Sequence, residues 1–168
     1  ALFPWPHCQA IWLFYLELSL RFRREGKFFS TERVRDLFEQ TLEKCPDPFD
    51  FYVLYYRFES EFGQARNAIN VLLRGAEACP LKVLDFYYLA IFETNKLVGI
   101  QGSRDIFENA IASLTSQPSL VIELCTEYCQ VEQQVGQLDR ARGLLVHASQ
   151  FADPKKFTDF WTFWKNWE

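Results

Sequence analysis

Apolar residues recur along this chain with the three- and four-residue spacing of amphipathic helices. The two clearest faces are Ile11, Tyr15, Leu18 and Phe22, and Leu37, Thr41, Leu42 and Cys45. The pattern is interrupted about once per helix by glycine or proline, at Gly26, Pro46, Pro48, Gly63, Pro80, Gly99, Gly102, Pro118, Gly136 and Pro154. The sequence therefore predicts an all-α chain of antiparallel helix pairs with short connections.

The first helix of each predicted pair carries a ladder of an aromatic residue, a second aromatic three residues later and a glutamate four residues further on. Full copies are Tyr52, Tyr55 and Glu59, and Trp161, Trp164 and Glu168. Diverged copies are Trp12, Tyr15 and Ser19, then Phe86, Leu89 and Glu93, then Cys125, Tyr128 and Glu132. Successive copies begin 34 to 40 residues apart.

The second helices carry a ladder of their own, in which Arg35, Phe38 and Glu39 match Arg104, Phe107 and Glu108. Diverged copies begin at Ile69 and Arg142, and six residues beyond each start comes a small residue: Thr41, Gly75, Ala110 or Ala148. Small side chains allow helices to cross closely. Two ladders with one common period predict a TPR-like α-α superhelix, or solenoid.

We treat residues 1–168 as a single solenoid segment. Its predicted repeats are about 8–46, 47–80, 81–118 and 119–153, followed by a half repeat at 154–168. Asp47-Pro48 and Asp153-Pro154 are each predicted to be a helix cap followed by a first-turn proline. Because the chain begins with Ala, contains no Met and ends within a helical pattern, we expect it to be a piece of a longer protein.

Composition and charge narrow the classes of function. Aromatic residues make up 17% of the chain, which favours thick helical layers separated by rings. The net charge of −4 argues against attraction of the whole surface to nucleic acid. No apolar run approaches the roughly 20 residues that a membrane span needs. Five cysteines without the spacing of a disulfide framework favour a reducing compartment.

Catalysis finds little support in the sequence. The two histidines, His7 and His147, lie far apart, and there is neither a nucleophile elbow nor a glycine-rich phosphate loop. The ladder glutamates recur in each unit, at Glu39, Glu59, Glu93, Glu108, Glu132 and Glu168. Such recurrence suits hydrogen bonding between helices better than a single active site. We therefore predict no enzyme activity, no cofactor and no small-molecule substrate.

A metal site is also considered. Cys125 and Cys129 share a helix face, and His147 belongs to the next helix, but a structural zinc site needs four such ligands and no fourth is apparent. Cys45 and Cys79 both precede a proline, in a slot that Leu114 and Ala152 fill in the other repeats. We therefore interpret the cysteines as small apolar core residues and predict no metal site.

A basic cluster is the one local departure from the acidic balance. Residues 21–35 contain six basic side chains and two acidic ones. From this cluster Arg21, Arg23, Arg24 and Lys27 are candidates for contact with RNA or an acidic partner. The alternative is a solvated turn in which Phe28 and Phe29 cover the layer below.

The last predicted helix is dense in aromatic residues: Trp161, Phe163, Trp164 and Trp167. In a chain of this length some of these rings would be left in solvent. We predict self-association or fraying there.

Three stretches carry a more specific resemblance. They are ERVRDLFEQTLEKCP at 32–46, LYYRFESEFGQAR at 54–66, and GQLDRAR at 136–142 leading to FWTFWK at 160–165. Together with the ladders, they resemble HAT (half-a-TPR) repeats, and in this order the C-terminal half of the Syf-one type of splicing factor. This family, also called XPA-binding splicing factors, belongs to the NineTeen Complex. The resemblance is strongest at 31–80 and 136–168, whereas 81–118 keeps only the ladder positions.

The resemblance implies a non-catalytic nuclear scaffold that binds other spliceosomal proteins in pre-mRNA splicing, with a link to transcription-coupled repair. Four alternatives stay open. They are a HAT scaffold of the crooked-neck type, a HAT scaffold of mRNA 3′-end cleavage, a solenoid that binds RNA directly, and a peptide-binding TPR co-chaperone. A peptide-binding TPR co-chaperone would need Lys, Arg and Asn residues at regular positions on successive first helices to bind a carboxylate, and the first helices lack such a set.

Overall fold

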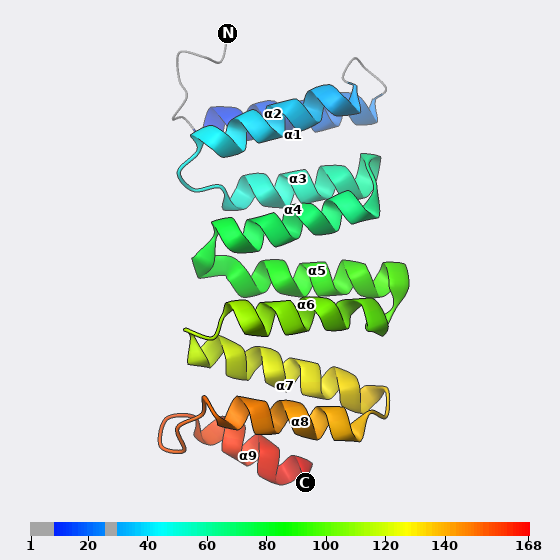
Figure 1. Cartoon of the computed structure of the whole chain (residues 1–168). Helices are drawn as coiled ribbons and strands as arrows, with labels where there is room; N and C mark the ends of the chain where they lie inside the picture. The colour runs from blue at the N-terminus through cyan, green and yellow to red at the C-terminus, as the bar shows by residue number, and fades with distance from the viewer. Residues whose placement is uncertain (1–8, 26–29) are drawn as a thin grey trace. The chain divides into compact units, whose positions relative to one another are not determined.

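A computed structural model describes residues 9–25 and 30–168 of the chain (Figure 1). Within these ranges all regular structure is helical, which confirms the predicted all-α fold of helix pairs. The helices are α1 (Gln9–Arg24), α2 (Thr31–Lys44), α3 (Phe49–Phe62), α4 (Ala65–Ala78), the short 3₁₀ helix η1 (Pro80–Lys82), α5 (Val83–Val98), α6 (Ile100–Ser113), α7 (Pro118–Gln134), α8 (Leu138–Ser149) and α9 (Thr158–Trp167).

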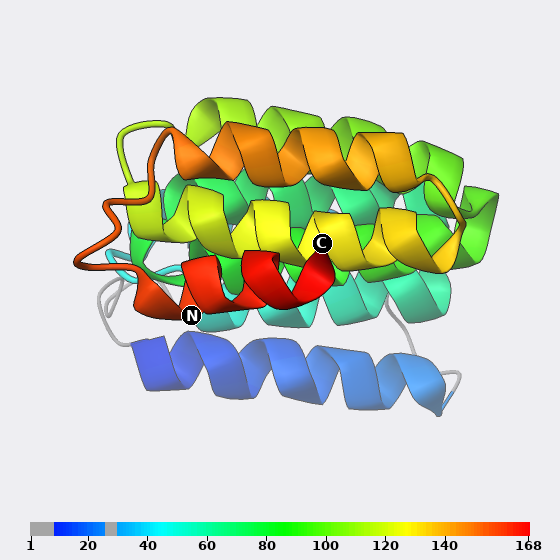
Figure 2. The ribbon, with the colours of Figure 1, turned by 90° about the horizontal axis from the view of Figure 1, so that it is seen from below.

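The chain forms two compact units, which we call unit 1 (Ala1–Ile100) and unit 2 (Gln101–Glu168). In unit 1, α1 packs against both α2 and α3, and α4 packs against α3 and α5, with successive helices antiparallel (Figure 1). In unit 2, α7 packs against α8, and the end of α9 contacts both of them, next to α8 in Figure 1 and next to α7 in Figure 2.

Some helix ends follow local sequence signals. The Ser30 hydroxyl caps α2 by accepting a hydrogen bond from the backbone N–H of Arg33 at 3.2 Å. Two helices stop at or near a glycine with positive φ, Gly99 after α5 (75°) and Gly136 after α7 (76°). Because an L side chain rarely adopts this conformation, glycine is the residue suited to these turns.

Three sequence predictions about helix ends are wrong. Pro48 itself is the N-cap residue of α3, and no side chain caps that helix. The Asp153 carboxylate accepts a hydrogen bond from the N–H of Lys155 at 2.9 Å in a turn, so α9 starts only at Thr158. Gly102 lies inside α6, because Gly99 has already ended the preceding helix and a single helical glycine costs only about 1 kcal/mol.

Aromatic rings fill much of the core between the helices. The largest fully buried rings are Phe38, Phe51, Phe58, Phe86, Phe107 and Tyr128. On α1 the buried face contains Trp12, Leu16 and Leu20, whereas Ile11 and Phe22 on the face picked out in the sequence are exposed. A helix can carry apolar residues on more than one face, so periodicity alone does not show which face is covered.

Positions with small side chains are buried at the helix crossings. Thr41, Gly75, Ala110 and Ala148 are all buried. At Gly75 in α4, an added Cβ would lie 2.6 Å from the ring of Phe86 in α5. The four residues that share one position in successive repeats are also all buried: Cys45, Cys79, Leu114 and Ala152. Among the described helices, none combines the length and apolarity that crossing a bilayer requires.

Candidate partner-binding surface

The α2–α3 contact in unit 1 contains a buried ion pair at the ladder positions. Arg35 donates from Nε and Nη2 to the two carboxylate oxygens of Glu59 at 2.6 and 2.9 Å. Only 1% of the Glu59 side chain is exposed, and Asn67 of α4 also donates to its carboxylate at 3.4 Å. One turn away, the ring of Phe38 stacks on that of Tyr55 with centroids 4.6 Å apart.

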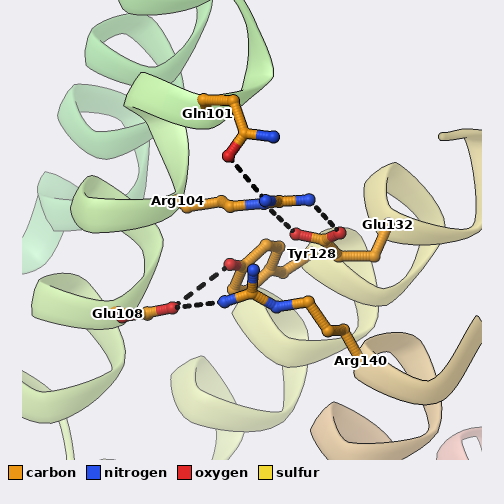
Figure 3. A network of polar contacts seen from close by, with 6 residues as sticks. All are labelled: Gln101, Arg104, Glu108, Tyr128, Glu132 and Arg140. Carbon is orange, nitrogen blue, oxygen red and sulfur yellow. Dashed lines mark hydrogen bonds and ion pairs between the residues drawn. The ribbon is translucent and has the colours of Figure 1, made fainter. Parts of the chain in front are cut away.

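The α6–α7 contact in unit 2 has the same arrangement (Figure 3). Arg104 donates to both oxygens of Glu132 at 2.7 and 2.8 Å, and Glu132 is fully buried. The ring of Phe107 stacks on Tyr128 at 4.5 Å. Gln101, one turn before Arg104, accepts a third hydrogen bond from that guanidinium at 2.7 Å, which fixes its orientation.

The α8–α9 contact repeats the ion pair in an exposed setting. Arg142 donates to the oxygens of Glu168 at 3.0 and 3.1 Å, but 53% and 45% of the two side chains are exposed. The Arg142 guanidinium also lies 5.5 Å from the ring centroid of Trp167. The three ladder arginines thus occupy equivalent places while differing in how far water reaches them.

The arginine–glutamate pair is missing at two of the first helices, α5 and α1. Ile69 in α4 stands where the other second helices have arginine, and Glu93 in α5 instead accepts hydrogen bonds from Tyr56 at 2.7 Å and Lys96 at 3.1 Å. In α1, Ser19 replaces the glutamate, and its buried hydroxyl donates to the carbonyl of Tyr15 at 2.8 Å.

A second set of ion pairs joins one second helix to the next within each unit. Arg74 of α4 donates to both oxygens of Glu39 in α2 at 2.8 and 2.7 Å. These hydrogen bonds hold the pKa of Glu39 below its ordinary value. In unit 2, Glu108 of α6 instead meets Arg140 of α8 and the hydroxyl of Tyr128, each at 3.4 Å (Figure 3).

Arg74 and Arg140 could not be identified from the repeat pattern, because they do not occupy matching positions. When Ile69 is aligned with Arg142, the residue matching Arg140 is Asn67, two helical turns before Arg74. The spacing of the repeats within the chain therefore could not reveal them. The signal that could have done so is a basic residue on each second helix facing the preceding ladder glutamate.

The cysteines of α7 lie in the core. Cys125 and Cys129 are fully buried, and burial raises the pKa of their thiols to about 12 and about 11. The ring of His147 packs edge-on against Phe151, with centroids 5.3 Å apart. Within the described part of the chain, no three His, Cys, Asp or Glu side chains come close enough to hold a metal ion.

The basic cluster lies partly outside the described residues. Lys27 is in the undescribed segment 26–29, as are Phe28 and Phe29, and the side chain of Arg23 is not described either. The exposed Arg24 donates to both carboxylate oxygens of Glu61 in α3, one of them at 2.7 Å. Arg21 Nε lies 3.6 Å from a carboxylate oxygen of Glu25, the residue that follows α1.

Arg21 and Arg24 line an open cleft of about 390 Å³ between α1 and α3. The other lining residues are Glu17, Leu20, Leu54 and Arg57. Arg57 is exposed and forms no salt bridge with any residue that the structure describes. Sequence reasoning missed Arg57, because it lies on a different helix and outside the basic cluster, where it looks like an ordinary surface residue.

Comparison with known proteins gives matches over the whole chain. The family model described as the C-terminal HAT repeat of the pre-mRNA-splicing factors Syf1/CRNKL1 matches residues 1–168. The pre-mRNA-splicing factor syf1 homolog of Drosophila melanogaster is 38% identical over 100% of this chain and 19% of its own length. The factor cwf3 of Schizosaccharomyces pombe is 36% identical over 100% of this chain and 21% of its own length.

The human protein named pre-mRNA-splicing factor SYF1 is 34% identical over 100% of this chain and 19% of its own length. The chain thus spans about a fifth of the length of these curated relatives.

Proposed function

The chain belongs to the Syf1/CRNKL1 family of C-terminal HAT repeats, as the resemblance predicted, and from this premise we propose that it is a scaffold segment for pre-mRNA splicing. In this role it binds other protein subunits of the spliceosome in the nucleus and carries out no reaction of its own. The observation that carries the proposal is that relatives named as pre-mRNA-splicing factors match the chain from end to end.

The interhelix contacts support a role based on shape. The ion pairs Arg35–Glu59 and Arg104–Glu132, with buried carboxylates, tie α2 to α3 and α6 to α7, each time a second helix to the first helix of the following pair. Helices held in this way keep their outward-facing side chains in fixed positions, so a partner can be bound by many modest contacts along the stack. The division into repeats at 8–46, 47–80, 81–118, 119–153 and 154–168 is part of this proposal.

Affinity purification of the full-length parent protein from nuclear extract, followed by mass spectrometry, tests the proposal. We expect spliceosomal proteins to be recovered, and fewer of them when residues 1–168 of this chain are deleted from the parent. Recovery of chaperones or of mRNA 3′-end cleavage factors in their place would overturn it. The matched control is a parent protein carrying Arg142→Ala, a change at an exposed ion pair that should leave the fold and the partners intact.

Direct RNA binding is the second candidate function, and the arginines of α1 are the observation that favours it. RNA binding driven by phosphate contacts weakens steeply as salt rises. A titration of the protein with a single-stranded RNA at several salt concentrations therefore tests this candidate, and the absence of binding at low salt would contradict it. The suggested link to transcription-coupled repair stays a prediction.

A further inference from the structure

We propose that the α1–α3 cleft is a docking site for an acidic segment of a partner protein, with an apolar side chain in the cleft and carboxylates on its arginines. The inference rests on the proposed scaffold function, and names one surface and the chemistry of its ligand. The ligand's apolar side chain lies between Leu20 and Leu54, and its carboxylates meet Arg21 and Arg57.

The base of the cleft suits an apolar side chain. Leu20 of α1 and Leu54 of α3 are both buried residues of the core that also line the cleft. Its volume of about 390 Å³ falls in the range of about 300–1,000 Å³ that is common for ligand sites. This volume is large enough for a single leucine- or phenylalanine-sized group, whose burial would contribute affinity through the hydrophobic effect.

The rim of the cleft suits carboxylates. Three of the six lining residues are arginines, and a guanidinium can bind a carboxylate through two parallel hydrogen bonds. Arg57 forms no salt bridge with a described residue, so it is available without breaking one. Arg21 pairs at 3.6 Å with Glu25, just beyond the end of α1, and an exposed pair of this kind contributes little free energy and is easily replaced.

The remaining arginine is held in place by its neighbour. Arg24 is bound through two hydrogen bonds to Glu61, which raises its pKa and fixes the guanidinium on the rim. Glu17, the one acidic lining residue, provides an acceptor for a backbone N–H of an extended peptide.

A protein ligand fits the cleft better than RNA does. Single-stranded RNA is usually held by bases stacked on aromatic rings or on arginine guanidinium planes, and none of the six residues that line the cleft is aromatic. The carboxylates of Glu17, Glu25 and Glu61 near these arginines would repel a phosphate backbone. A peptide with a few separated carboxylates avoids much of this repulsion.

Fluorescence anisotropy with the full-length protein tests the proposal. The probe is a short labelled peptide with one leucine flanked by glutamates, compared with the same peptide carrying glutamines and with a single-stranded RNA. We expect the acidic peptide to bind, more weakly as salt rises, and the glutamine peptide to bind at least about fivefold more weakly.

The variant Arg57→Glu should weaken acidic-peptide binding by about five- to tenfold, because it replaces an attraction with a repulsion on the rim. Arg66→Glu is the matched control. It makes the same charge change at an exposed arginine of α4 that does not line the cleft, and it should leave binding unchanged. Thermal unfolding of both variants shows whether each keeps its fold, and Arg57→Gln replaces Arg57→Glu if the latter is destabilised.

Two results would overturn the proposal: the acidic peptide fails to bind the unchanged protein, or it binds both arginine variants equally well. Preferential binding of the RNA, lost in Arg57→Glu, would overturn it in favour of a nucleic-acid site. Each of these results leaves the scaffold function standing if spliceosomal proteins still co-purify with the parent protein. Loss of those proteins from the unchanged parent would instead refute the scaffold function.

Discussion

At the scale of single residues, the ladder arginines form equivalent bonds in unequal surroundings. The side chain of Glu132 is 0% exposed, whereas that of Glu168 is 45% exposed, although each accepts two hydrogen bonds from one arginine. Removing one partner of a buried pair leaves a charge without compensation, whereas water replaces a lost partner at the surface. Arg104 and Arg142 should therefore differ greatly in how much each contributes to the free energy of unfolding.

Arg104→Ala should lower the free energy of unfolding by about 3–5 kcal/mol, because it leaves the buried carboxylate of Glu132 unpaired. Arg142→Ala should lower it by no more than about 1 kcal/mol. Urea denaturation followed by circular dichroism measures both changes. Similar losses in the two variants would contradict the assignment of burial as the cause.

Burial should also suppress the reactivity of the α7 thiols. With a pKa of about 12, Cys125 has far less thiolate at pH 8 than an ordinary cysteine, whose pKa is about 8.5. We expect Cys125 and Cys129 to resist iodoacetamide in the native protein and to react once urea unfolds it. Peptide mass spectrometry distinguishes the sites, and equal labelling rates with and without urea would contradict this prediction.

At the scale of helices, small residues set how closely two elements approach. Gly75→Ala should destabilise the protein by about 1–3 kcal/mol, because its Cβ would lie 2.6 Å from the Phe86 ring. Gly143→Ala is the matched control, since that glycine lies in α8 with nothing within 4 Å of an added Cβ. This control should stabilise the protein by about 0.5–1 kcal/mol.

Thermal unfolding of the two glycine variants checks these opposite signs. A gain of stability in both variants would show that helix propensity and not close packing governs these positions. A loss of stability in both would contradict the open space at Gly143.

The sequence predicted the helices and their ladders because both depend on regular spacing. Arg35 and Glu59 recur with the repeat, so their positions could be read before their contact was known. The Arg74–Glu39 pair could not, because an arginine reaches its partner from different turns of a helix in the two units. The cleft could not be predicted from the sequence either, because only the packing of α1 against α3 brings Arg57 close to the arginines of α1.

At the scale of the whole molecule, α9 presents partly exposed aromatic rings, through which we expect one chain to contact another. Phe160 is buried, whereas Trp161, Phe163, Trp164 and Trp167 are only partly covered. Trp161 and Trp164 stack on each other with centroids 5.5 Å apart and an interplanar angle of 16°, leaving a partly exposed aromatic face. Such a face favours association.

We therefore expect the 168-residue chain to self-associate as its concentration rises, as measured by sedimentation velocity. Phe163→Ser should weaken the association, because it removes a partly exposed ring that stacks on no described neighbour. A chain that remains monomeric at high concentration would contradict the prediction.

The positions of the buried ion pairs have a mechanical consequence. Arg35 lies near the start of α2 and Glu59 near the end of α3, whereas the loop joining these helices leaves from their opposite ends. Arg104 and Glu132 lie in the same way on α6 and α7. In both cases the loop connects the two helices at one end, and the ion pair connects them at the other. A partner that pulls on one helix therefore turns its neighbour with it, so the load is shared instead of opening the pair.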